Sequence, residues 1–109
     1  MAHYLIADVI VNDDSWLPAY AEKVHDIVAK HGGKYLSRSA NITTLEGQGR
    51  DTNVIALLEF PSLEAIRGFI DDPDYADFAK ARQDGTDSWF RAIDDTDAAG
   101  TIPYLPKAE

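Results

Sequence analysis

The clearest structural signal in the chain is the segment Thr52–Asp72, TNVIALLEFPSLEAIRGFIDD. It opens with an apolar run, Val54–Phe60, whose length and branched side chains are typical of a strand covered on both faces. Glu59 is the only charged residue in that run. Pro61 has no N–H for a sheet hydrogen bond, and Ser62 is a favourable helix N-cap. The segment therefore predicts a buried strand that leads directly into an amphipathic helix.

The composition is that of a single acidic domain without disulfide bonds. Its 109 residues suffice for one hydrophobic core, and the absence of cysteine fits a reducing cytoplasm. A formal net charge of −9 disfavours nucleic acid and membrane surfaces as partners, because binding to phosphate groups needs basic surfaces. No signal-peptide pattern opens the chain, and no apolar run approaches the ~20 residues of a membrane span. We therefore expect a cytoplasmic protein.

Hydrophobic periodicity predicts both helices and strands. Apolar residues at helical spacing predict a first helix that ends at Gly32 and Gly33, which supply a positive φ. A turn-rich stretch, residues 46–51, predicts a hairpin connection between the second and third strands. We expect strands at residues 3–11, 34–45, 54–60 and 86–93, and helices at residues 16–31, 62–71 and 75–82.

The order of these elements is that of the ferredoxin-like α+β fold, β-α-β-β-α-β, with a helical extension before the last strand. We expect residues 1–95 to form a four-stranded antiparallel sheet with helices on one face, and residues 96–109 to form an irregular C-terminal tail. Because the first and third strands are apolar on both faces, the face without helices needs a partner. A second copy of the sheet is the simplest one. This predicts a homodimer with face-to-face sheets, on which the apolar tail residues 102–105 would dock.

Several sequence motifs occur in an order that resembles the domain-of-unknown-function 1330 family: His31–Arg38, Leu45–Gly47, Leu58–Ser62 and Asp72–Arg82. The resemblance covers residues 4–93 and implies a dimeric α/β barrel made from ferredoxin-like protomers, in agreement with the homodimer inferred above. It implies no particular activity. Relatives in that superfamily include cofactor-independent monooxygenases, muconolactone-type isomerases and haem enzymes such as chlorite dismutase, and a shared fold does not determine a reaction.

Arg38 and Glu59 are charged residues inside strands that we expect to be buried, and a buried charge needs a partner. One interpretation is a structural ion pair or a charge that reaches solvent at the strand end. The other is a pocket in which Glu59 acts as a base and Arg38 holds an anion or an enolate. Arg82 gives the same choice, because it shares a helix face with Tyr75. The family resemblance places an arginine and a tyrosine at these two positions.

Other side chains are candidates for contacts with a substrate. Asn41 could orient a carbonyl group or cap a strand edge, and Trp89 could pack on a ligand or in the core. The same choice applies to further aromatic residues, Trp16, Tyr20 and Tyr35.

His25 lies on the flank of the first helix, where a histidine is usually a surface residue and only sometimes catalytic. The spacing of His3, His25 and His31 matches no metal site, so we expect no metal and no cofactor.

Three functional interpretations remain open from the sequence. The first is an enzyme without a tightly bound cofactor that performs proton transfer or oxygenation on a small organic acid or aromatic. Its pocket would lie between sheet and helices, with Glu59 as base and with Arg38 and Arg82 as anchors of the anion. The second is a small-molecule-binding module without turnover. The third is a structural dimer whose buried charges pair with one another.

Overall fold

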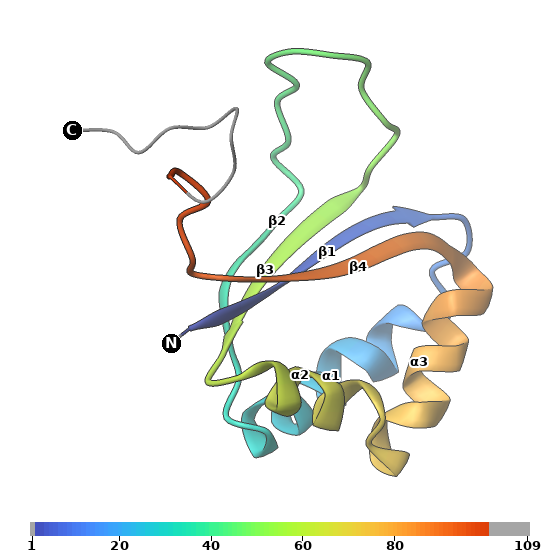
Figure 1. The fold of residues 1–109 in the computed structure, drawn as a ribbon. Helices are drawn as coiled ribbons and strands as arrows, with labels where there is room; N and C mark the ends of the chain where they lie inside the picture. The colour runs from blue at the N-terminus through green and yellow to red at the C-terminus, as the bar shows by residue number, and fades with distance from the viewer. Residues whose placement is uncertain (1, 101–109) are drawn as a thin grey trace.

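A computed structural model of the protein describes residues 2–100 (Figure 1). The elements are β1 (His3–Val11), α1 (Leu17–Lys30), β2 (Lys34–Ser39), β3 (Val54–Phe60), α2 (Leu63–Ile70), α3 (Pro73–Gly85) and β4 (Thr86–Asp94). Their order confirms the predicted succession of strands and helices. None of the helices within residues 2–100 has the length and apolar character needed to cross a membrane. The predicted docking of tail residues 102–105 lies outside the described residues.

The strands form one antiparallel sheet in the order β2-β3-β1-β4. The central strand β1 places Ala7 opposite Ala56 of β3 and opposite Phe90 of β4. All three helices lie on one face of this sheet (Figure 1). The ferredoxin-like α+β architecture predicted from the sequence is therefore confirmed. The sheet of one chain is open, with β2 and β4 at its edges, so a closed barrel is not formed within the protomer.

The helix ends follow local sequence signals. The hydroxyl of Ser62 accepts a hydrogen bond from the Ala65 N–H at 3.0 Å and caps α2. The carboxylate of Asp72 accepts one from the Asp74 N–H at 2.8 Å and caps α3. Gly32 has a φ of +78° directly after the C-cap residue of α1, which is the conformation that glycine adopts most readily.

The second strand is shorter than the sequence predicts, because it ends at Ser39 rather than at residue 45. Ser39 pairs with Ile55, and β3 begins only one residue before Ile55, so residues beyond Ser39 have no partner strand. Residues 40–53 form no strand, and the connection is much longer than the predicted hairpin turn at residues 46–51. A β-bulge between Tyr35 and Ser37 adds a second irregularity to this edge strand.

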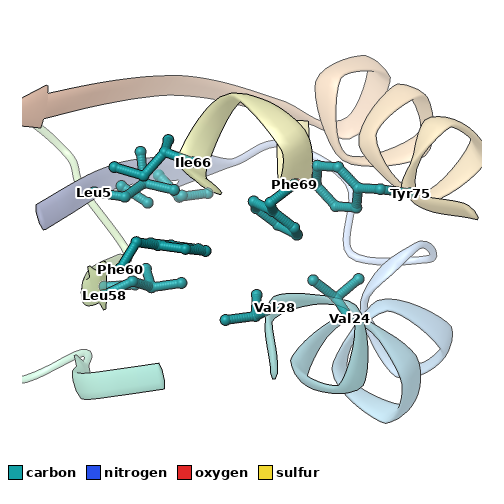
Figure 2. Close-up of a cluster of buried hydrophobic side chains, with 11 residues drawn as sticks. Leu5, Val24, Val28, Leu58, Phe60, Ile66, Phe69 and Tyr75 are labelled. Carbon is teal, nitrogen blue, oxygen red and sulfur yellow. The ribbon is translucent and has the colours of Figure 1, made fainter. Parts of the chain in front are cut away.

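The hydrophobic core fills the space between the helices and the sheet (Figure 2). Three aromatic rings are stacked in series: Phe60 and Phe69 have centroids 5.9 Å apart, and Phe69 and Tyr75 have centroids 4.4 Å apart. Val24 and Val28 face this stack from α1. A side chain at Gly33 would collide with the Phe60 ring, so glycine is required where α1 passes into β2. This core fixes the helices against the sheet at one end of the sandwich.

The opposite face of the sheet has no helix over it within residues 2–100, and it carries many apolar side chains beside the charged residues Asp8, Glu59, Asp87 and Arg91. Strand alternation places these side chains on that face: Tyr4, Ile6, Ile10, Ile55, Leu57, Trp89 and Ile93. Trp89 and Ile93 are 50% and 56% exposed, whereas the neighbouring Phe90 packs against the core. Trp89 and Phe90 thus point to opposite faces of the sheet.

Candidate functional site

A cavity of about 230 Å³ lies between the sheet and the helices. Small and branched apolar side chains of the two central strands form its floor: Leu5, Ala7, Val9, Val54, Ala56 and Leu58. Aromatic side chains form much of its wall: Trp16, Tyr20, Tyr35, Phe69 and Phe90. The charged residues that line it are Arg38 and Arg82, and its described lining includes no carboxylate and no histidine.

Arg82 brings a buried positive charge to the cavity from α3. The residue is only 6% exposed. Its Nη1 donates a hydrogen bond to the Ser88 hydroxyl at 2.5 Å, and its guanidinium carbon lies 4.0 Å from the centroid of the Phe90 ring. Within residues 2–100, Arg82 has no ion-pair partner, and its buried Nε has no hydrogen-bond partner. A buried cation without a counter-charge is costly, so this arrangement favours an anion beside it.

Arg38 contributes a second guanidinium from β2. It points to the helix side of the sheet, because it pairs in register with Ala56, which also lines the cavity. Its guanidinium carbon lies 3.9 Å from the centroid of the Tyr35 ring, a cation–π contact. Arg38 is exposed, whereas Arg82 is buried. The cavity is therefore positively charged both at its solvent side and in its interior.

Two tyrosine hydroxyls meet at the wall of the cavity. The Tyr20 and Tyr75 hydroxyl oxygens lie 2.6 Å apart, and Tyr75 is fully buried. Burial raises the pKa of Tyr20 well above its ordinary value, and the nearby Tyr75 raises it further. Burial also raises the pKa of Tyr35. The phenols of Tyr20 and Tyr35 thus stay neutral near pH 7 and can donate hydrogen bonds.

Trp16 occupies the end of the cavity at which α3 passes into β4. The N–H groups of Asn12 and Asp13 donate to the Gly85 carbonyl at 2.8 and 2.9 Å, and these bonds bring the turn before α1 onto that point. A Cβ at Gly85 would lie 2.5 Å from the Trp16 indole, so glycine leaves room for the ring. The Trp16 ring also packs edge-to-face on Tyr20, with centroids 5.1 Å apart. Its buried Nε1 has no hydrogen-bond partner among residues 2–100.

The structure brings together only part of the predicted site. Arg38 and Arg82 line the same cavity, and Tyr75 reaches its wall through Tyr20. The expectation that Glu59 shares this pocket is wrong. Leu58 and Phe60 face the helices, so the intervening Glu59 points to the other face of the sheet.

The other predicted contact residues also lie outside the cavity. Asn41 borders a shallow hollow on the face without helices, next to Ser37 and Ser39. Trp89 lies on that same face and is covered by Arg50, whose guanidinium carbon is 3.4 Å from the ring centroid. His25 is exposed on α1 and lies 3.3 Å from the Asp26 carboxylate.

Sequence reasoning missed the contributions of Ser88 and Arg50. Ser88 orients Arg82, and only the turn from α3 into β4 brings these residues together. Arg50 reaches over Trp89 and lies 3.8 Å from the Asp8 carboxylate and 3.9 Å from that of Asp87. No local pattern in the sequence marks either contact.

A second polar cluster lies at the far end of α1, away from the cavity lining. The Asp72 carboxylate is 2.7 Å from His31 Nε2 and 2.8 Å from Lys30 Nζ. Hydrogen bonds from Lys30 and His31, together with the Asp74 N–H, lower the pKa of Asp72 far below its ordinary range. This cluster ties the end of α1 to the start of α3. Across residues 2–100, nowhere do three or more His, Asp or Glu side chains gather so that they could hold a metal ion.

The comparison with protein families supplies the identity of this fold. The family model described as "Domain of unknown function (DUF1330)" matches residues 2–96. The chain belongs to the DUF1330 family. The resemblance inferred from the ordered sequence motifs is thereby confirmed. A search of curated proteins gives no match.

Several solved structures are similar in fold to this DUF1330 chain. The RPA0582 protein of unknown function from Rhodopseudomonas palustris is 20% identical, with a TM-score of 0.75 over 88% of this chain and 83% of that one. SnoaB, a cofactor-independent oxygenase from Streptomyces nogalater, is 12% identical, with a TM-score of 0.61 over 88% and 94%. A dimeric protein of unknown function with a ferredoxin-like fold from Bacteroides fragilis is 13% identical, with a TM-score of 0.53 over 85% and 95%. At these identities the likeness shows the fold alone.

Proposed function

We propose that the protein binds a small organic anion with an apolar or aromatic body in the cavity between sheet and helices. The observation that carries this proposal is the pair Arg38 and Arg82, which line one cavity whose described lining has no carboxylate. Guanidinium groups form strong charge-assisted hydrogen bonds with carboxylates and related oxyanions. A ligand with one negative charge would offset the buried charge of Arg82.

The size and surface of the cavity restrict the ligand further. Its volume of about 230 Å³ is smaller than the roughly 300–1,000 Å³ of sites for drug-sized ligands. The floor is apolar, and burial of apolar ligand surface contributes about 25 cal/mol per Å². Flat aromatic residues, including Tyr35 and Phe69, line the wall. The matching ligand is therefore a small acid, phenolate or enolate with a compact apolar body.

Cofactor-independent oxygenation of that anion is the second candidate function. It is supported by the fold shared with SnoaB, which is described as a cofactor-independent oxygenase. An enol or phenol that is already ionised needs no side-chain base, and the described cavity lining offers neither a carboxylate nor a histidine. Arg38 and Arg82 would stabilise the delocalised charge of the ionised substrate. Proton transfer by Glu59 receives no support from its position on the other face of the sheet.

We further propose that the protein is a homodimer through face-to-face sheets. The apolar side chains on the sheet face without helices support this, as does the description of the Bacteroides fragilis protein as dimeric. A cytoplasmic location and a domain boundary after residue 95 remain predictions from the sequence.

The anion proposal is tested by ligand-dependent melting against a panel of small aromatic and aliphatic acids. Arg38→Ala is the test variant, and Arg67→Ala, on the exposed surface of α2, is the matched control. We expect at least one acid to raise the melting temperature of the wild type and of Arg67→Ala, with a clearly smaller rise for Arg38→Ala. A panel without any stabilising acid, or equal shifts in all three proteins, would contradict the proposal. Oxygen consumption in the presence of each hit separates an oxygenase from a binding module.

A further inference from the structure

Two side chains that line the cavity each carry a buried hydrogen-bond donor without a partner within residues 2–100. The donors are Nε1 of Trp16 and Nε of Arg82. A buried tryptophan N–H usually finds an acceptor, and a buried donor without a partner destabilises the folded state. Other contacts hold both side chains in position. Arg82 Nη1 donates a hydrogen bond to Ser88, and the Trp16 ring packs on Tyr20. Both side chains are thus held in place, and each has one buried nitrogen without a hydrogen-bond partner among the described residues.

The side chains that carry the two donors lie at the same end of the cavity. Arg82 and Gly85 are three residues apart on α3 and therefore share one face of the helix. The Trp16 indole lies directly against Gly85. Tyr20 also lines the cavity and packs on Trp16. It lies near enough to Arg82 for an electrostatic interaction between the two side chains. The remainder of the cavity floor is apolar, so this end differs in chemistry from the rest.

We infer that Trp16 Nε1 and Arg82 Nε hold the acceptor head of the ligand, and that this head is a pair of oxygen atoms sharing one negative charge. The inference rests on the proposed anion-binding function and specifies the ligand class. A carboxylate has such a head, and so does the enolate of a 1,3-dicarbonyl compound. Its apolar body would lie over Ala7, Ala56 and Leu58 on the cavity floor. In this arrangement Arg38, which is exposed, supplies long-range attraction, and Trp16 supplies selectivity for the head.

The test uses three small-molecule probes and compares the two tryptophans of the chain, Trp16 and Trp89. 2-Naphthoate and the enolate of benzoylacetone represent the two oxyanion sources, and 2-naphthamide is the neutral analogue of similar shape. Trp16→Phe removes the donor and keeps an aromatic ring. Trp89→Phe, on the opposite sheet face, is the matched control. The chain has two tryptophans, so a ¹⁵N-labelled protein shows two indole N–H signals, which the two variants assign.

We expect at least one oxyanion probe to bind the wild type and to move the Trp16 indole N–H signal downfield, while the Trp89 signal stays in place. Loss of a hydrogen bond to a charged group should weaken binding about tenfold or more in Trp16→Phe, and Trp89→Phe should bind like the wild type. The amide should bind at least tenfold more weakly than the oxyanion of the same shape. The probe that binds more tightly shows whether the site prefers a carboxylate or the enolate of a 1,3-dicarbonyl compound.

The opposite results are equally distinct. If an acid binds with dependence on Arg38, but the Trp16 signal does not move and Trp16→Phe keeps full affinity, the inference is wrong and the proposed function stands. An amide that binds as tightly as the oxyanion also overturns the charged head. If neither oxyanion probe nor any acid of the melting panel binds, the proposed function fails and this inference fails with it.

Discussion

The hydroxyl oxygens of Tyr20 and Tyr75 lie 2.6 Å apart, and this hydrogen bond joins α1 to α3 at the wall of the cavity. Tyr75 stacks on Phe69 and Tyr20 packs against Trp16, so the bond connects the aromatic core with the aromatic wall of the site. The site is therefore supported by the same contacts that hold the two helices together.

Replacing Tyr20 by phenylalanine should destabilise the protein, because the buried Tyr75 hydroxyl loses its partner. We expect the free energy of unfolding to fall by about 1–3 kcal/mol. Urea unfolding of Tyr20→Phe measures this, with Tyr4→Phe on the opposite sheet face as control. Equal stabilities of the two variants would contradict a stabilising hydroxyl pair. The double variant Tyr20→Phe/Tyr75→Phe should lose less than the sum of the single changes.

Replacing Arg82 by methionine should separate stability from binding. The buried guanidinium has no carboxylate partner within the described chain, so an apolar side chain of similar length removes a desolvated charge. We expect the free energy of unfolding to change by less than about 1.5 kcal/mol, because the Ser88 hydrogen bond is the main loss. Stabilisation by organic acids should disappear. A loss of about 3–5 kcal/mol, as for a broken buried ion pair, would instead assign Arg82 to the fold.

Acid should weaken the contact between α1 and α3 through Asp72. Lys30 and His31 lower the pKa of Asp72 in the folded state, so its carboxylate stabilises the fold above its unfolded pKa, near 3.8. That contribution is lost as the pH falls below this value and the folded carboxyl takes up a proton.

Asp72→Asn tests this, because the amide keeps an oxygen that can accept the Asp74 N–H at the start of α3. We expect unfolding curves between pH 6 and pH 3 to show a smaller loss of stability on acidification for Asp72→Asn than for the wild type. Asp77→Asn, on the exposed side of α3, should follow the wild type. Parallel curves for all three proteins would show that Asp72 does not set the acid sensitivity.

Local sequence signals were sufficient for most of the fold. The signals at Pro61, Ser62 and Gly32 act within a few residues of their own positions. The strand and helices that begin or end at these residues appear as predicted. The length of β2 was not predictable in this way. Ser39 is its last residue because β3 begins at Val54, and the choice of partner strand is a non-local property.

The candidate site was predictable only where periodicity alone fixes the direction of a side chain. The helix face that contains Tyr75 also contains Arg82, and both are buried as that pattern indicates. Period-two alternation within β3 places Glu59 and Leu58 on opposite faces of the sheet. The charges of Glu59 and Arg38 suggested a shared pocket, but the strand geometry excludes it. The contact of Arg50 with Trp89 depends on the path of residues 40–53, which carry no periodic pattern.

The uncovered sheet face leads to the last prediction. Leu57 lies on that face in register with Ile6, at its centre, so a carboxylate there would be buried between two copies of the sheet. Light scattering of the wild type should give twice the chain mass of 12.0 kDa, and Leu57→Asp should give the mass of one chain. Leu45→Asp is the control, because Leu45 is 92% exposed in the segment between β2 and β3.

We expect Leu57→Asp to stay folded, because the Leu57 side chain is not part of the core between sheet and helices. Thermal melting of the variant checks this. A wild type of one chain mass at micromolar concentration would exclude the homodimer. A dimeric Leu57→Asp variant would place the interface on another surface. A monomeric Leu57→Asp that still binds an organic acid would show that each protomer holds a complete cavity, because every residue proposed to contact the ligand comes from one chain.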